Sequence, residues 1–187
     1  MTLTPINSGW IEVICGSMFS GKTEELMRRL RRAEIAKMNI EIFKPKIDSR
    51  FSSEHIVSHD QSKMESHIID DPKKILNISK DSEVVGIDET QFFAFSIVKV
   101  CKTLASQGKR VVVAGLDTDY RGLPFGPMPD IMCEADYLDK LRAICVKCGN
   151  PASYTQRTSS DSLQVVIGEH DKYEARCRNC FQPPKKN

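Results

Sequence analysis

Residues 16 to 23 read GSMFSGKT and match the phosphate-binding pattern G-x-x-x-x-G-K-[ST]. The glycines of this pattern allow successive backbone N–H groups to point inward at phosphate oxygens. Lys22 is expected to reach the β and γ phosphates of a nucleotide, and the Thr23 hydroxyl to ligate Mg²⁺. The pattern therefore predicts a nucleotide site made of Gly16, Ser17, Met18, Phe19, Ser20, Gly21, Lys22 and Thr23.

Two adjacent carboxylates, Asp88 and Glu89, end the otherwise apolar segment VVGIDE at residues 84 to 89. In enzymes with a phosphate-binding loop, a carboxylate at such a strand end holds the Mg²⁺, directly or through its waters. Asp88 is the candidate for that role. Glu89 is the candidate base for the group that attacks the γ phosphate, which is water in an ATPase and a substrate hydroxyl in a kinase.

Two C-x-x-C pairs, CVKC and CRNC, supply Cys145, Cys148, Cys177 and Cys180. Four thiolates at this spacing are the usual ligands of a closed tetrahedral Zn²⁺ site, so the predicted metal is structural. A redox C-x-x-C or an iron–sulfur cluster explains two symmetric pairs less simply. We expect a Cys177→Ser change to loosen the C-terminal domain before it affects ATP binding, because the phosphate-binding loop belongs to the other domain.

The surrounding pattern predicts the strand and the helix that a phosphate-binding loop needs. Residues 10 to 15 are apolar and β-branched, which favours a strand, while Leu26, Leu30 and Ala33 recur at helical spacing. Further strands are expected at 40 to 45, 84 to 88 and 111 to 116, with a helix at 92 to 109. The alternation indicates an α/β fold in which helices cover a parallel sheet.

Two segments stand outside this alternation. The polar, serine-rich residues 46 to 63 are predicted to form a long surface loop or a lid. From residue 142 onward the composition changes, so we predict a nucleotide-binding domain at 1–141 and a metal-binding domain at 142–187. The 28 residues between the cysteine pairs mix aromatic, apolar and hydrogen-bonding groups that suit a flat ligand.

Charge and composition argue against nucleic acid and membranes as partners. The 187 residues carry 27 basic and 25 acidic side chains, a formal net charge of +2, which is too balanced for a nucleic-acid-binding surface. The arginines of MRRLRR are predicted to lie on the solvent side of a helix near acidic residues. No apolar run is long enough to span a membrane, and the N-terminus has no secretion pattern, so a cytoplasmic protein without disulfides is expected.

The motifs GSMFSGKTEELMRRLRR, IDETQFF, AGLDTDYRGLPFG, CVKC, YTQR, DKY and CRNC, in this order, closely resemble the type II thymidine kinases, the zinc-containing class. The similarity runs from about Trp10 to Phe181. It implies a RecA-like domain with the phosphate-binding loop, followed by a small zinc-stabilised lasso domain. It further implies transfer of the γ phosphate of ATP to the 5′-hydroxyl of thymidine, a cytosolic homotetramer, and feedback inhibition by thymidine triphosphate.

The resemblance also implies roles for single residues. Glu89 corresponds to the catalytic base, Asp88 to the magnesium-associated acid, and Gln91 joins the nucleotide site. Tyr120 stands where the family frequently has Phe, which leaves the fine nucleoside preference open. The implied nucleoside-binding positions are Met18, Asp48, Arg50, Phe92, Leu116, Tyr120, Phe125, Thr155, Val166 and Tyr173.

A second function class fits the phosphate-binding loop and the cysteine pairs taken alone. A zinc-ribbon ATPase that acts on nucleic acid would contain both features. The near-neutral charge, the absence of a second motor domain in the sequence and the long insertion between the cysteine pairs argue against it.

Overall fold

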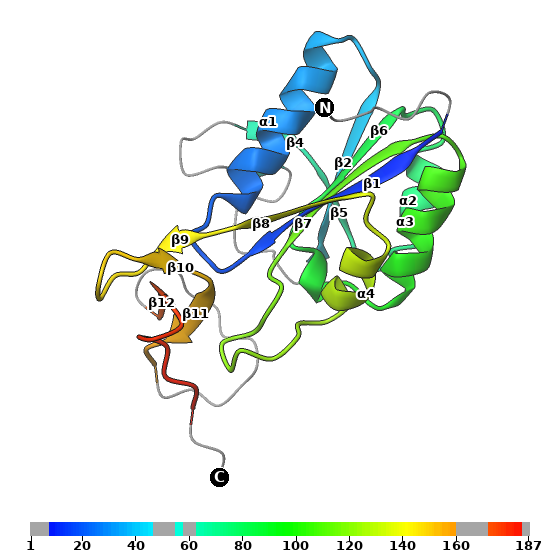
Figure 1. Ribbon diagram of the computed structural model, residues 1–187. Helices are drawn as coiled ribbons and strands as arrows, with labels where there is room; N and C mark the ends of the chain where they lie inside the picture. Colours follow the sequence, from blue (N-terminus) through cyan, green and yellow to red (C-terminus); the bar gives the residue numbers. More distant parts are fainter. Residues whose placement is uncertain (1–7, 47–54, 58–62, 160–171, 185–187) are drawn as a thin grey trace.

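A computed structural model describes residues 8–46, 55–57, 63–159 and 172–184. Its centre is a six-stranded sheet in the order β5-β2-β6-β7-β1-β8, and every neighbouring pair runs parallel (Figure 1). The strands are β1 (Trp10–Gly16), β2 (Ile40–Pro45), β5 (His67–Ile69), β6 (Val84–Ile87), β7 (Arg110–Gly115) and β8 (Tyr137–Leu141). The predicted α/β fold with a parallel sheet is confirmed.

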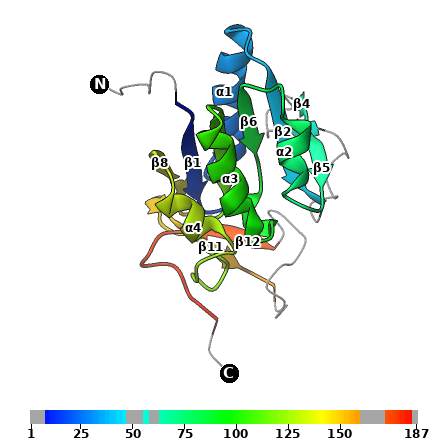
Figure 2. The same ribbon diagram turned by 90° about the vertical axis from the view of Figure 1, so that its right-hand side faces the viewer.

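Helices cover both faces of the sheet. The helix that follows the phosphate-binding loop, α1 (Lys22–Ile35), packs on one face through Leu26, Met27, Leu30 and Ala33. The opposite face is covered by α2 (Lys74–Ile78), α3 (Ser96–Ser106) and α4 (Met128–Cys133), as Figure 2 shows. Two separate apolar layers therefore hold the central strands, which are buried on both sides.

The central strands fit between these layers because their side chains alternate between the two faces. In β7, Val111 and Val113 belong to the layer with α3, while Val112 and Ala114 belong to the layer with α1. Close packing explains the glycine at position 86 in β6, because a Cβ atom there would lie only 2.7 Å from the Cδ1 atom of Leu30. Its missing side chain lets α1 lie close to the sheet.

The C-terminal module consists of short strands beyond the end of β8. Strands β9 (Ala143–Ile144) and β10 (Pro151–Ala152) pair antiparallel, as do β11 (Tyr154–Arg157) and β12 (Tyr173–Arg176). Its own small apolar cluster contains Ala143, Cys145, Ala152, Ala175 and Cys177. We refer to residues 143–159 and 172–184 as the C-terminal module.

Several elements differ from the sequence-based expectation. The helix expected at 92 to 109 begins only at Ser96, because the 3₁₀ turn Thr90–Phe92 and the extended, buried Phe93 precede it. Four short elements were not predicted because their sequences show no clear apolar periodicity: strands β5 and β8 and helices α2 and α4. Within the segment expected to be an irregular loop, β3 (His55–Val57) pairs with β4 (Lys63–Glu65).

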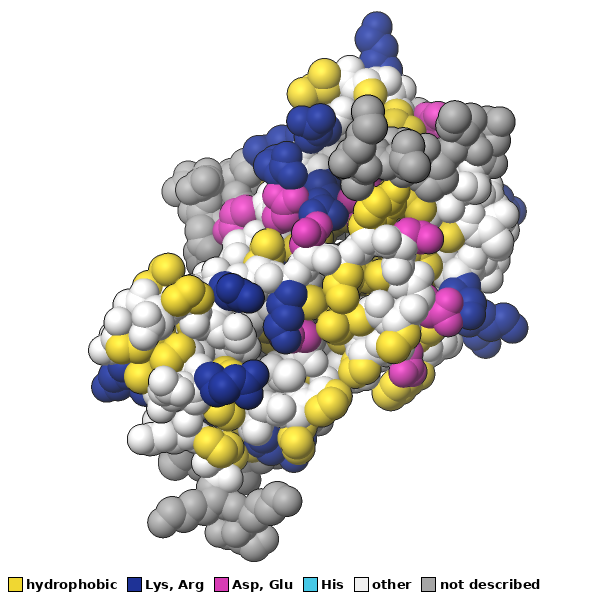
Figure 3. Space-filling model, in the orientation of Figure 1, with side chains coloured by type: hydrophobic (Ala, Val, Ile, Leu, Met, Phe, Trp, Pro, Cys, Tyr) yellow, Lys and Arg dark blue, Asp and Glu magenta, His cyan; other side chains and the backbone are white. Residues whose placement is uncertain are grey.

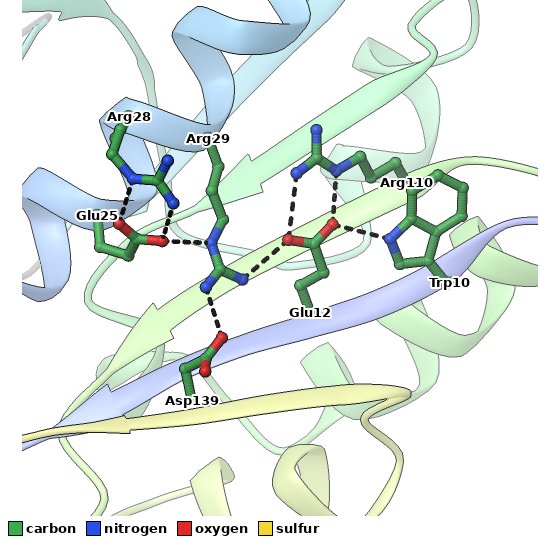
Figure 4. A network of polar contacts seen from close by, with 7 residues as sticks. All are labelled: Trp10, Glu12, Glu25, Arg28, Arg29, Arg110 and Asp139. Atoms are coloured by element: carbon green, nitrogen blue, oxygen red, sulfur yellow. Dashed lines mark hydrogen bonds and ion pairs between the residues drawn. The ribbon is translucent and has the colours of Figure 1, made fainter. Parts of the chain in front are cut away.

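A buried ion network joins α1 to the sheet (Figure 4). Glu12 of β1 accepts hydrogen bonds from Trp10, Arg29 and Arg110, and Arg29 also donates to Glu25 and Asp139. The Arg29 side chain is only 11% exposed, so its predicted position on the solvent side of the helix is wrong. The carboxylates of neighbouring strands draw it inward.

Arg28, by contrast, lies on the exposed side and pairs with Glu25. The face of the molecule in Figure 3 shows basic and acidic side chains interspersed over α1 and the adjacent edge of the sheet. Of the four arginines in MRRLRR, Arg28 and Arg29 are thus paired with carboxylates.

Candidate nucleotide and substrate site

The phosphate-binding loop occupies the turn between β1 and α1. Gly16 and Gly21 have φ angles of 145° and 81°, which favour glycine, so the two fixed glycines of the motif serve the backbone shape. Lys22 Nζ donates to the carbonyl oxygen of Ser17 at 2.8 Å, and the Ser20 hydroxyl donates to the same oxygen at 2.8 Å. The lysine is thus held over the loop that would surround the phosphates.

Thr23, in the first turn of α1, is hydrogen-bonded to Asp88, which follows β6, although 65 residues separate them in the sequence. The Thr23 hydroxyl donates to Asp88 Oδ2 at 3.1 Å, and the backbone N–H of Glu89 donates to Asp88 Oδ1 at 2.9 Å. Burial and the neighbouring Glu89 charge raise the pKa of Asp88 to about 7. A hydroxyl and a carboxylate in contact are oxygen ligands of the kind that Mg²⁺ takes beside phosphates.

Glu89 has an unusual backbone conformation. Its φ angle of 50° lies in the left-handed region, which costs a non-glycine residue about 1 kcal/mol or more. The described residues contain three non-glycine positions of this kind, Phe19, Lys37 and Glu89, and two of them belong to this site.

Gln91 orients the Glu89 carboxylate. Its amide Nε2 donates to Glu89 Oε2 at 2.5 Å, while its Oε1 accepts the backbone N–H of Leu116 at 2.9 Å. Gly115 makes room for this bridge, since a Cβ there would lie 2.8 Å from Gln91 Oε1. Gln91 therefore connects the candidate base to the end of β7, the strand between β1 and β6.

A further buried carboxylate near the site, Asp117, follows β7 and was not among the residues predicted from the sequence. Lys140 at the end of β8 forms an ion pair with it, with 2.6 Å between Nζ and Oδ2. Burial lowers the pKa of Lys22, and the charges of Glu89, Asp88 and Asp117 oppose that change. Asp117 follows an apolar run that was predicted as a strand, but only the fold shows that this strand lies beside β1, so no local spacing could have identified the residue.

Aromatic residues gather beside the candidate base. Phe92 and Phe125 pack edge to face, with ring centroids 5.5 Å apart. The guanidinium of Arg157 lies 3.5 Å from the centroid of the Tyr120 ring, and Arg157 also donates a hydrogen bond to the Tyr173 hydroxyl at 2.9 Å. Each of these two groups joins residues distant in sequence, and Arg157 is a residue that the implied substrate-binding positions did not include.

Other implied nucleoside-binding residues lie at the junction with the C-terminal module or outside the described part. Thr155, which is 3% exposed, accepts the backbone N–H of Met18 on its hydroxyl at 3.0 Å. Leu116 is half-buried beside Gln91. Asp48, Arg50 and Val166 lie outside the described residues, as do residues 160–171 of the insertion between the cysteine pairs.

The four predicted metal ligands converge in the C-terminal module. The sulfur atoms of Cys145, Cys148, Cys177 and Cys180 all lie within 4.8 Å of one another. Cys148 Sγ is 3.6 Å from the sulfurs of both Cys177 and Cys180, close to the separation of about 3.8 Å between thiolates of a tetrahedral zinc site. The Asn150 amide donates to Cys148 Sγ at 3.4 Å, an outer contact that suits a thiolate.

This combination of fold and site is that of the proteins that bind a nucleotide through a phosphate-binding loop, with buried and half-buried carboxylates beside it. The sequence model of the thymidine kinase family matches residues 9–181. The chain therefore belongs to the thymidine kinase family.

Similar proteins in several bacteria cover nearly all of the chain. The thymidine kinase of Rhodothermus sp. (strain ITI 518) is 55% identical over 177 residues, which is 95% of this chain and 83% of that protein. The thymidine kinase of Bdellovibrio bacteriovorus is 53% identical over 94% of this chain and 86% of its own length. The thymidine kinase of Bacteroides fragilis is 53% identical, with 93% and 87% covered.

A search of solved structures gives a weaker similarity. Domain III of the Thermotoga maritima replication initiation protein DnaA superposes with a TM-score of 0.45 at 14% identity, over 71% of this chain and 55% of that chain. A similarity of this size carries no argument about function. Within the described part of the chain, no helix has both the length and the apolar character needed to cross a membrane.

Proposed function

We propose that this chain transfers the γ phosphate of ATP to the 5′-hydroxyl of thymidine, giving thymidine monophosphate for deoxynucleotide salvage. Membership of the thymidine kinase family supports the substrates. The observation that carries the reaction type is the arrangement of Glu89, fixed by Gln91, next to the Thr23–Asp88 pair and the aromatic residues Phe92 and Phe125.

In this mechanism the phosphate-binding loop and Lys22 hold the phosphates in line with the sugar hydroxyl. Glu89 accepts the proton of the 5′-hydroxyl as that oxygen forms its bond to the γ phosphorus. The bond between the γ phosphorus and its bridging oxygen breaks, and ADP leaves. Lys22 and the loop N–H groups counter the negative charge of the transferring group, which is the main electrostatic contribution expected of the protein.

Two metals are part of the proposal. Thr23 and Asp88 are the residues that would hold Mg²⁺, which when bound neutralises charge on the phosphate oxygens. The four cysteines would hold one structural Zn²⁺, and four protein ligands leave no position for a catalytic water. The close approach of their sulfurs supports this assignment.

Further proposals rest on the resemblance to the type II class. These are assembly as a homotetramer, feedback inhibition by thymidine triphosphate, a cytoplasmic location, and deoxyuridine as a second acceptor. The division into a domain at 1–141 and another at 142–187 is also a proposal. It is supported by the separate apolar cluster of the C-terminal module and by the end of β8 at Leu141.

The decisive experiment measures transfer of labelled γ phosphate from ATP to thymidine, with single-stranded DNA as the competing effector. We expect labelled thymidine monophosphate, magnesium dependence, and no stimulation of ATP hydrolysis by DNA. Hydrolysis stimulated by DNA, with thymidine left unphosphorylated, would favour the nucleic-acid ATPase instead. The interspersed charges on the surface give no support to that alternative.

A further inference from the structure

The phosphate-binding loop contacts the C-terminal module through three successive residues (Figure 1). The Ser17 hydroxyl donates to the carbonyl oxygen of Ala152 at 3.4 Å. The backbone N–H of Met18 donates to the Thr155 hydroxyl at 3.0 Å. The loop is therefore attached to both antiparallel ladders of the module. The sequence-based expectation that Cys177→Ser loosens the C-terminal domain before it affects ATP binding had assumed no such attachment.

Phe19 makes the third contact. Its side chain packs against the apolar cluster of the module, which includes Cys145 and Cys177, two of the four candidate metal ligands. The backbone of Phe19 is in the left-handed region, with a φ angle of 64°. Such a conformation is unfavourable for Phe by about 1 kcal/mol or more, and it persists where surrounding contacts stabilise it. The module supplies those contacts.

The contact at Ser17 leads directly to the phosphate-binding lysine. The Ser17 carbonyl oxygen accepts from Lys22 Nζ and from the Ser20 hydroxyl, both at 2.8 Å. The Ser17 side chain is fully buried and faces Ala152. A displacement of the module would thus move the group that positions Lys22.

The module has little to hold it in place without a metal. Its strands are two to four residues long, and its apolar cluster consists of five small or cysteine residues. Two-stranded ladders of this size are marginally stable at best in water, and small modules of this kind commonly depend on a metal for folding. Metal binding by the four cysteines would therefore determine whether the module surface against Phe19, and Thr155 within the module, are held in place.

We propose that Phe19 and Thr155 are positioning residues that couple metal binding at the four cysteines to nucleotide binding at the phosphate-binding loop. The inference rests on the proposed zinc site. Coupling between two sites is reciprocal, so zinc strengthens nucleotide binding by the same factor as nucleotide strengthens zinc binding. Coupling of this kind typically changes affinity by about 5- to 150-fold.

The test measures zinc affinity of the full chain by competition with a chelator, with and without saturating magnesium and the β,γ-imido analogue of ATP. We expect the analogue to strengthen zinc binding about fivefold or more. The reciprocal titration follows analogue binding to the zinc-loaded and the zinc-free chain and should give the same factor. Neither readout depends on turnover.

Variants at the contacts identify the residues responsible. Thr155→Val keeps the shape of the side chain but removes the acceptor for Met18 N–H, so the coupling factor should fall while one zinc per chain remains. Thr155→Ser retains the hydroxyl and should preserve the coupling. Phe19→Leu should weaken it by reducing contact with the cysteine cluster.

A matched control removes an aromatic ring elsewhere in the module. Phe181 stacks on Tyr154, with ring centroids 4.5 Å apart, so Phe181→Ala should leave the coupling factor unchanged. Zinc and analogue that bind the parent chain independently would overturn the inference while leaving the proposed function intact. A chain that contains no zinc would contradict the metal assignment itself.

Discussion

The phosphate-binding loop and the C-terminal module lie against each other but owe their structure to different forces. The loop emerges from β1, a strand whose residues from Ile11 to Gly16 are buried between helices on both faces of the sheet. The module has five buried cluster residues, two of which are cysteines. The first region is fixed by apolar packing of the whole domain, whereas the second has little apolar core and, with the proposed zinc site, would depend on metal binding by its four cysteines.

The two regions supply different kinds of residue to the candidate site. Charged groups of the site come from the sheet region: Lys22 begins α1 after the phosphate-binding loop, and Asp88 and Glu89 follow β6, in agreement with the usual location of ligands in parallel α/β folds. Groups that would contact the proposed nucleoside, such as Thr155, Arg157 and Tyr173, come from the module. A region with a small core is suited to adjust around a ligand.

The largest effect is expected where the rigid region meets the phosphates. Lys22→Ala should lower kcat by about 10³-fold or more, because catalysis of phosphoryl transfer is mostly electrostatic positioning. Steady-state kinetics with ATP and thymidine measure the loss. Lys102→Ala, which removes an exposed lysine paired with Glu134, serves as the control and should behave like the parent. Near-normal turnover of Lys22→Ala would contradict the nucleotide site.

Glu89→Gln separates proton abstraction from binding in the same region. The change keeps the size of the side chain but removes the basic oxygen, so kcat should fall by about 10² to 10⁴ while thymidine binding is largely kept. Asp88→Asn should instead weaken the response to Mg²⁺. Full activity of Glu89→Gln would mean that another group accepts the proton.

Cys177→Ser tests whether the two regions are independent. The variant should lose zinc and thermal stability, and its affinity for the ATP analogue should fall about 5- to 150-fold if the contacts of Phe19 and Thr155 couple the sites. Metal analysis and a nucleotide titration measure the two effects. Cys133→Ser, at an exposed cysteine outside the cluster, is the control. Unchanged nucleotide affinity in zinc-free Cys177→Ser would restore the view of two independent domains.

Arg157→Lys tests the contribution of the module to the nucleoside pocket. Lysine keeps the charge but loses the planar group that stacks on Tyr120 and reaches the Tyr173 hydroxyl. We expect KM for thymidine to rise about tenfold with a smaller change in kcat. Arg178→Lys, at an exposed arginine over Tyr154, should change neither constant. Equal kinetics of both variants would exclude a role for Arg157 in the pocket.

The smallest expected effect concerns the stability of the sheet region in acid. Hydrogen bonds from Arg28 and Arg29 lower the pKa of Glu25 to about 2 from 4.5. A lowered carboxyl pKa stabilises the folded state above pH 4.5, and this contribution is lost as the pH falls through about 2. Because Glu25 is 20% exposed, solvent screening reduces the contribution to about 1 kcal/mol.

Urea unfolding of Glu25→Gln and the parent chain at several pH values measures this contribution. The difference in unfolding free energy should be present at pH 6 and shrink between pH 4.5 and 2. Glu34→Gln, at an exposed position of the same helix, is the control and should show a smaller difference. A difference for Glu25→Gln that does not change with pH would show that the ion pairs are not its cause.

How much could be read from the sequence differs between the elements. The strands at 10 to 15, 40 to 45, 84 to 88 and 111 to 116 were predicted to within about a residue, because each is a short apolar run between turn signals. β5 and β8 were missed. They lie at the two edges of the sheet, where most of their residues are exposed or half-buried and neither sequence forms a long apolar run.

The residues of the candidate site also differ in whether the sequence alone could identify them. The phosphate-binding pattern and the cysteine spacing can be recognised from the sequence. Neighbouring residues set the backbone shape of the loop and the distance between the two sulfur atoms of each cysteine pair. Asp117 and Arg157 carry no local pattern. Their importance comes from Lys140 and Tyr120, which only the folded chain brings to them.

By itself the sequence indicated the nucleotide-binding loop, the candidate metal ligands and the family, since each rests on residue types at short, fixed spacings. Only the tertiary structure decided that Arg29 is largely shielded from solvent, that Gln91 links the candidate base to Leu116, and that the phosphate-binding loop is attached to the C-terminal module. Those features depend on which strand ends and turns become neighbours. That choice is made by the packing of the whole chain, because sheet order and helix placement bring together residues that no local spacing connects.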